Sequence, residues 1–362
     1  MKDKHPFIFR ASGFIGLFLF LSCAKPLQWV NTQEPENRDD MVTVLFSAAE
    51  GGLSKVSGIT DASERHIGRW AVFAFDNSSS WFRYATSDSG GDIPMNLLAA
   101  HSYSCFAIVN YSTSGTGAFL PATVSTPDDL SEKVAYLGDN AVGNLLMYGS
   151  ASFTPLTGVQ DCTIPVKRIV SRINVAGIAV DFSEKPHLAA KTFTLRHIYI
   201  TNAYRTTKYG SDYSWTEISD ARAAWYNSGG WHRGENGESG MDSLLGQRNI
   251  NAVITQANPY TVLQSFYAFP NPLSREDDDQ QLTVWSRRCT RIILEATLGD
   301  ETMYYQIHVP SMERNYVYTA ANIVIRGRGI HDPEIPDDPY SLDVNISIQD
   351  GWDDPAGGEL NL

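Results

Sequence analysis

The chain lacks the residue patterns that support chemistry at a metal ion or a nucleotide. Its 362 residues include only four cysteines, and no two of them form a CxxC pair. No glycine-rich phosphate loop follows a strand-like run, and neither HExxH nor GxSxG occurs. The eight histidines are scattered along the chain. The sequence therefore gives no reason to expect a metal site, a cofactor or a catalytic constellation, and it predicts a protein that is not an enzyme.

Positive charge is also scarce. Lysine and arginine number 28 against 41 aspartates and glutamates, which gives a formal net charge of −13. This balance argues against nucleic acid and anionic membrane surfaces as partners. The hydrophobic content of 43% is enough for globular cores, and the length favours two domains over one.

The N-terminus has the composition of an export signal. A basic segment at residues 1–10 precedes an apolar run at residues 11–21, which is too short to span a bilayer comfortably. Cys23 follows directly, as in a bacterial lipobox, although Phe20 stands where an aliphatic residue is usual. We expect residues 1–22 to be a signal peptide and a lipid on Cys23 to anchor the exported chain to a membrane. The alternative is ordinary secretory cleavage with Cys23 incidental.

The rest of the sequence is typical of an all-β protein built from β-sandwiches. Tyrosine, phenylalanine and glycine are plentiful, and short alternating runs are separated by turn signals. After a polar tether at 23–40, we expect an N-terminal sandwich domain at 41–184 and a C-terminal one at 185–330. One helical patch is expected, with Asp128 as its cap. The expected strands cover 42–47, 69–76, 103–111, 167–182, 193–203, 265–270 and 315–327, with a hairpin at 290–310 that turns at residues 299–300.

Three cysteines remain after removal of the signal. Cys105 and Cys162 fall in the same expected domain and could form a disulfide in an oxidising periplasm. The alternative is that these two and Cys289 are buried free thiols. The sequence leaves both open.

The end of the chain, residues 331–362, combines a spacer and an isolated strand. A proline-rich acidic segment, 331–340, precedes a run in which four apolar residues alternate with polar ones. This strand could complete a sandwich of another chain by strand addition, or it could fold back into its own C-terminal domain. The four apolar residues are Leu342, Val344, Ile346 and Ile348.

A rival function class is a surface lipoprotein that binds a glycan or another host or bacterial surface ligand and does not polymerise. Its working surface would be the aromatic, glycine-rich loop at 225–240, which contains Trp225 and Trp231. The acidic run at 274–281 matches no calcium loop and is better explained as a solvated surface loop.

Several segments together resemble the fimbrillins, the subunits of the type V pili of Bacteroidota, over nearly the whole chain. Cys23 matches the family's lipidation site. The other segments that resemble the family are "YSCFAIVNY" at 103–111, "LLMYGS" at 145–150, "VKRIVSRINV" at 166–175, "FYAFPNP" at 266–272 and "YYQIHVPSMERNYVYTAANIVIRGRG" at 304–329. The resemblance implies two transthyretin-like β-sandwich domains in tandem.

The resemblance also implies a mechanism of assembly into an adhesive pilus on the outer membrane. An arginine-specific protease would remove the first strand, here carried by Val42, Val44 and Phe46, and a neighbouring subunit would fill the groove with its strand 342–348. The cut would follow Arg65, with Lys55 and Arg69 as the next candidates. The loop has no Arg-Ala pair, in which it departs from a common family pattern. An uncut, lipidated anchor subunit is the alternative role.

Overall fold

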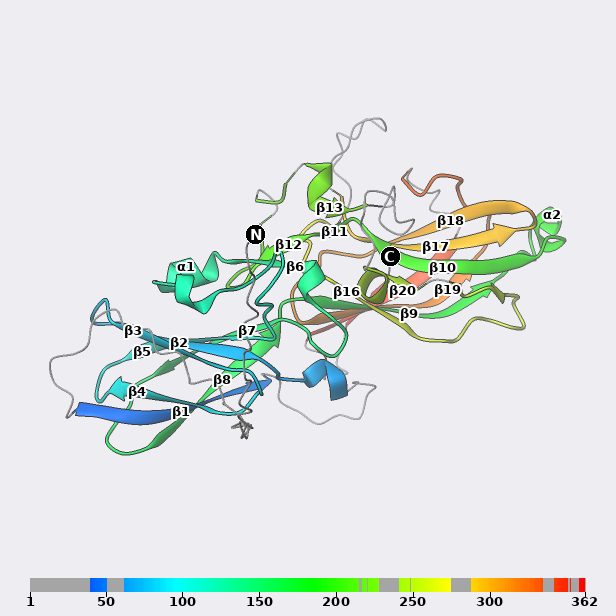
Figure 1. Ribbon diagram of the computed structural model, residues 1–362. Coiled ribbons are helices and arrows are strands. Elements are labelled where there is room, and N and C mark those ends of the chain that lie inside the picture. Colours follow the sequence, from blue (N-terminus) through cyan, green and yellow to red (C-terminus); the bar gives the residue numbers. More distant parts are fainter. Residues whose placement is uncertain are drawn as a thin grey trace, which may run out of the picture.

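The structure, a computed structural model, describes residues 40–50, 62–214, 217–219, 221–227, 241–247, 249–274, 288–334, 342–350, 352 and 358–361. It is dominated by β-strands, with helices of one turn or little more. Within those ranges no helix is long and apolar enough to cross a membrane. Figure 1 shows two β-rich bodies side by side, the first carrying β1 to β8 and the second carrying β9, β10 and β16 to β20.

The first body is a seven-stranded sheet with the order β3-β2-β5-β7-β8-β1-β4. The two strands at the ends of this order, β3 and β4, are in contact, so the sheet folds over an interior. That interior is apolar because the strands alternate, and its side chains include Val44, Phe46 and Trp70, all at 0% exposure. The strands are β1 Met41–Glu50, β2 Trp70–Asp76, β3 Phe82–Ser87, β4 Ile93–Leu98, β5 Tyr103–Val109, β7 Met147–Phe153 and β8 Gln160–Arg168.

The outer face of β2 and β3 is covered by the segment that runs from residue 111 to 146 (Figure 1). This segment holds the short helices η3 Pro121–Thr123, α1 Pro127–Ser131 and η4 Leu137–Asp139, and the strand β6 Val134–Tyr136. The expected helical patch is thus a single turn, and its cap is Thr126, whose hydroxyl accepts from the Asp129 N–H. The prediction of Asp128 as the cap is wrong.

The second body is a sandwich of two sheets. One sheet has the order β14-β10-β17-β18, with β15 also on β10, and the other has the order β16-β9-β19-β20-β21. Their facing side chains, such as Tyr199, Ile293 and Tyr318, form one core. The strands are β9 Ser171–Val180, β10 Phe193–Thr201, β14 Gly246–Gln247, β15 Ala252–Val253, β16 Gln264–Ala268, β17 Arg291–Leu298, β18 Glu301–His308, β19 Tyr316–Ile325, β20 Leu342–Asp350 and β21 Gly358–Asn361.

Smaller elements complete the chain. They are η2 Ala62–Arg65, α2 Pro186–Ala189, β11 Ala203–Tyr204, β12 Thr206–Lys208, η5 Arg222–Ala224, β13 Trp225–Tyr226 and α3 Asp242–Leu245. Strand β12 pairs with β6 and strand β11 pairs with β13. The β6–β12 pair thereby joins the cover of the first sheet to the second half of the chain.

The prediction of one long strand over 167–182 is wrong. Strand β8 ends at Arg168 and β9 begins at Ser171, and β9 pairs with β16 and β19 rather than with the first sheet. The sheets therefore change over at residues 169–170, ahead of the boundary at 184 expected from the sequence. The predicted hairpin at 290–310 is confirmed as β17 and β18, and Gly299 takes the left-handed φ of 63° that its turn needs.

Candidate strand-exchange site

The first strand, β1, is held on both sides. Its N-terminal half pairs antiparallel with β4, from Met41 opposite Leu98 to Phe46 opposite Ile93. Its C-terminal half pairs parallel with β8, and Glu50 lies opposite Val166. Loss of β1 would leave two strands with unpaired backbone groups and an open apolar core between them, which is the condition for strand addition.

The predicted first-strand residues all face this core. Val44 and Phe46 are fully buried, and Val42 is partly buried against the same cluster. Phe46 meets Phe153 edge to face, with 6.4 Å between ring centroids. Burial of these side chains holds β1 firmly in the uncut chain.

The C-terminal strand lies in its own domain. Strand β20 pairs antiparallel with β19, from Leu342 opposite Ile325 to Asp350 opposite Tyr316. Of its four apolar side chains, Ile346 is buried at 2% exposure, while Leu342, Val344 and Ile348 are only partly buried. Of the two arrangements that the sequence left open, this chain on its own adopts the one in which the strand folds back.

The three candidate cut sites differ in their surroundings. Arg69 is a poor substrate: its guanidinium donates to Asp88 at 2.6 Å and to Thr113 at 2.9 Å, and its carbonyl accepts from Asn110 at 2.7 Å. Lys55 lies outside the described residues. Arg65 ends η2, and its exposed side chain lies 3.6 Å from the Glu50 carboxylate. Proteases bind an accessible, extended chain, so Arg65 fits best of the two described sites.

A buried residue that the sequence analysis missed, Asn110, fixes the segment that follows Arg65. Asn110, at 2% exposure, accepts from the Gly68 N–H at 2.8 Å and donates to the His66 carbonyl at 2.8 Å. It also donates to the Leu145 carbonyl at 2.9 Å. The segment that starts at His66 is therefore fixed to the first body independently of β1, and a cut after Arg65 falls just before it.

Glu64, the residue before Arg65, is buried between the two bodies. Its carboxylate pairs with Arg172 of β9 at 2.8 Å and accepts a hydrogen bond from the Tyr267 hydroxyl of β16. Trp352, beyond β20, covers Arg172 with 4.9 Å between guanidinium and ring. The segment around Glu64 is thus tied to the second domain and, through Arg172, to the C-terminal segment. A glutamate in a polar loop gives no sign in the sequence that it will be buried.

Replacement of Glu64 by glutamine is expected to speed cleavage after Arg65 by about tenfold or more. The amide keeps the shape but loses the charge that Arg172 needs, and such a charge-assisted bond contributes roughly 1.5–3 kcal/mol. Cleavage rate follows the population of the locally open state. The measurement is the rate of digestion by an arginine-specific protease. Glu132→Gln, an exposed carboxylate on Lys208, is the control and should cleave at the wild-type rate. Equal rates for the two variants would contradict the role of Glu64.

The cysteines lie in the first core. Cys105 and Cys162 are both buried and free, and their side chains are hydrogen-bonded to each other. This bond and burial raise the pKa of the Cys105 thiol, and the same bond lowers the pKa of Cys162. The structure therefore brings the two sulfurs together, and their oxidation to a disulfide stays a prediction. Cys289 is a separate buried thiol, whose pKa burial raises to about 12.

The alternative hypothesis placed a ligand-binding surface on the loop at 225–240. Trp225 is fully buried, donates to the Ser219 carbonyl at 2.9 Å and packs edge to face on Tyr204. It does not present its ring to a ligand, so its expected place on a binding surface is wrong. Trp231 and most of the acidic run, like Cys23, lie outside the described residues.

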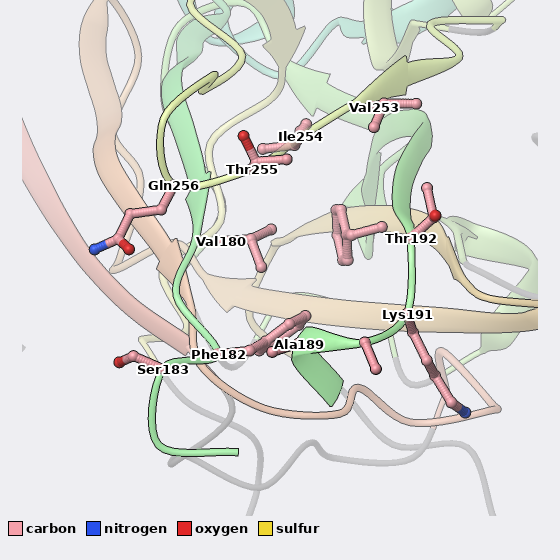
Figure 2. Close-up of a pocket in the computed structure, with 12 residues that line it drawn as sticks. Val180, Phe182, Ser183, Ala189, Lys191, Thr192, Val253, Ile254, Thr255 and Gln256 are labelled. Atoms are coloured by element: carbon pink, nitrogen blue, oxygen red, sulfur yellow. The ribbon is translucent and has the colours of Figure 1, made fainter. Parts of the chain in front are cut away.

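The described part of the chain has a hollow but no cluster of possible metal ligands. The described residues contain no group of three or more His, Cys, Asp or Glu side chains that could hold a metal ion. A hollow of about 430 Å³ lies near α2, where Figure 2 shows Val180 and Ile254 on its wall and Lys191 directed away from them. Lys191 pairs with Glu301 at 3.1 Å instead. The hollow is lined largely by apolar side chains and holds no pair of reactive groups.

The fold, two tandem β-sandwiches, is similar to that of solved fimbrial and cell adhesion proteins. A candidate cell adhesion protein from Parabacteroides distasonis matches with a TM-score of 0.55 at 15% identity, over 86% of this chain and 99% of its own. A fimbrilin from Porphyromonas gingivalis matches with a TM-score of 0.54 at 15% identity, over 86% and 97%.

A third solved structure, the tip fimbrial protein Mfa3 from Porphyromonas gingivalis with a C-terminal truncation, matches with a TM-score of 0.52 at 14% identity, over 86% of this chain and 99% of its own. No family model matches the sequence. No curated protein matches it either. At these identities the likeness shows the fold, and the predicted all-β, two-sandwich architecture is confirmed.

Proposed function

We propose that this protein is a structural subunit of a fimbrium that assembles by exchange of strands between copies. It is exported as a lipoprotein and held in the outer membrane through Cys23. Cleavage after Arg65 removes β1, and β20 of a neighbouring subunit takes its place. The pilus serves adhesion, and the subunit has no enzymatic activity.

One observation carries this proposal: β20 has the same inward-facing pattern as β1. The inward positions of β1 are Val42, Val44, Phe46 and Ala48, and the apolar positions of β20 are Leu342, Val344, Ile346 and Ile348. Both sets are four apolar residues at a spacing of two, with nearly the same number of side-chain carbon atoms. Cores tolerate substitutions that conserve volume in this way, so β20 suits the space that β1 leaves.

The two strands differ in how firmly the uncut chain holds them. Strand β1 has two fully buried side chains and lies between β4 and β8, of six and nine residues. Among the side chains of β20 whose burial is described, at 342–349, only Ile346 is buried, and the strand on its outer side is the four-residue β21. Release of β20 therefore costs less than release of β1, which supports β20 as the strand donated and β1 as the strand that needs cleavage.

The fold supports the same function. The solved structures with this fold include a fimbrilin and a tip fimbrial protein, so a surface or fimbrial location and association with other pilus subunits are the natural proposals. An uncut anchor subunit would use the same fold with β1 retained.

The first test is the N-terminus of the protein recovered from the cell surface, by intact mass and terminal sequencing. We expect it to begin at His66. A start at a lipid-modified Cys23 would leave β1 in place, overturn the polymerising role and point to an anchor subunit or to a lipoprotein that does not polymerise.

A further inference from the structure

The end of β1 that faces the second domain is bound by a buried cation. Arg168, the last residue of β8, is 1% exposed. Its guanidinium pairs with the Glu50 carboxylate at 2.5 Å, and its Nε donates to the Glu64 carbonyl at 3.1 Å. The ring of Trp352 lies over it at 4.2 Å. A buried guanidinium without a carboxylate is strongly unfavourable, so this site needs an anion.

Cleavage after Arg65 removes that anion. Glu50 and Glu64 both lie upstream of the cut and leave with β1. Among the described residues they are the carboxylates that form ion pairs with Arg168 and Arg172. The groove that opens therefore has an apolar floor and two arginines at the end next to the second domain. A strand of purely apolar and neutral residues would fill the floor and leave the arginines without a counter-charge.

Strand β20 carries a carboxylate at the matching position. When Leu342 is set in the place of Val42, the four apolar residues coincide with those of β1. Asp350 then falls on Glu50, eight residues further on the same face in both strands. The match requires β20 to run in the direction of β1. A shift of one residue would turn Asp350 to the outer face, and a reversed strand would bring no carboxylate to Arg168.

We propose that Arg168 is the receptor for Asp350 of a second copy of this chain, and that their ion pair fixes the direction and register of the incoming strand. This proposal rests on the proposed function and adds to it the group that recognises the partner. Arg168 thereby acts as a specificity residue, because a strand with the right apolar pattern but no carboxylate at this position is discriminated against.

The test measures binding of a labelled, end-capped peptide of residues 342–352 to the full chain after cleavage by an arginine-specific protease. The wild-type peptide should bind the cut protein and not the uncut one, in which β1 fills the groove. The peptide with Asp350→Asn should bind about ten- to a hundredfold more weakly, as expected for loss of a charge-assisted bond to a buried arginine.

The matched control is the peptide with Asp343→Asn. It removes the same charge from the same strand at a position that falls on Thr43, which faces outward and bonds Asn96. It should bind within about threefold of the wild-type peptide. Equal weakening by the two substitutions, or none by Asp350→Asn, would overturn the receptor role of Arg168 while leaving strand exchange intact. If the wild-type peptide fails to bind the cut protein, or binds the uncut protein equally, the proposed function falls with it.

Discussion

Arg65→Ala is expected to leave the chain uncut after residue 65 and to abolish polymer formation. The side chain is exposed and its contact with Glu50 spans 3.6 Å, so its loss should change the free energy of unfolding by no more than about 0.5 kcal/mol. Without the cut, β1 stays between β4 and β8 and no groove opens. The measurement is the ladder of polymers formed by purified full-length protein after addition of an arginine-specific protease.

Lys55→Ala is the matched control, because it removes a basic residue from the same connection between β1 and β2. It should polymerise as the wild type does. Normal polymers from Arg65→Ala would show that the cut does not follow Arg65, and because the added protease does not cleave after lysine, Arg69 would then be the next candidate.

Phe46→Ala is expected to destabilise the uncut protein by about 3–5 kcal/mol and to leave the finished polymer unchanged. The ring is fully buried in the first core, and its removal leaves a large cavity. In the polymer, however, residue 46 has been removed with β1, so its identity no longer matters. Urea unfolding of the uncut chain and the temperature at which polymers dissociate measure the two effects.

Two further variants test whether these effects are specific to Phe46. Ser47→Ala, on the outer face of β1 where the hydroxyl meets that of Thr163 at 3.0 Å, should cost less than about 1 kcal/mol in the uncut chain. Ile346→Ala should weaken both forms, since Ile346 is buried in its own domain and is also proposed to fill the groove of the neighbour. Polymers of Phe46→Ala that dissociate at a lower temperature than wild type would show that β1 is retained.

The sequence predicts the strands better than it predicts their partners. Short apolar, β-branched and aromatic runs located β1, β2, β5, β10 and β17 to β20, and in β1 and β20 these runs alternate with a period of two; both signals are local. They did not separate β8 from β9, since residues 167–182 contain no glycine or proline turn signal near Ile169 and Val170, and both residues are fully buried where the chain passes between sheets. Sheet membership depends on contacts far apart in the sequence, which a local pattern does not contain.

The same limit applies to the polar part of the candidate site. The arginines of "VKRIVSRINV" were visible as basic residues in an aliphatic strand, but their partners Glu50, Glu64 and Trp352 lie more than a hundred residues away. Asn110 shows only as a polar residue at the end of a strand. Burial of such groups is decided by the meeting of the two bodies, and so the charges at the cut site became apparent only in the folded chain.

The covalent link between β1 and the rest of the chain protects the uncut subunit from premature assembly. As long as residues 51–61 connect β1 to the rest, β1 competes for the groove as part of the same molecule, at an effective concentration on the order of millimolar. A free neighbour at micromolar concentration cannot displace it, even if β20 binds equally well. Cleavage turns β1 into a separate, dilutable peptide. Assembly is thereby switched on by loss of a tether, with no need for the donor strand to bind more tightly than the strand it replaces.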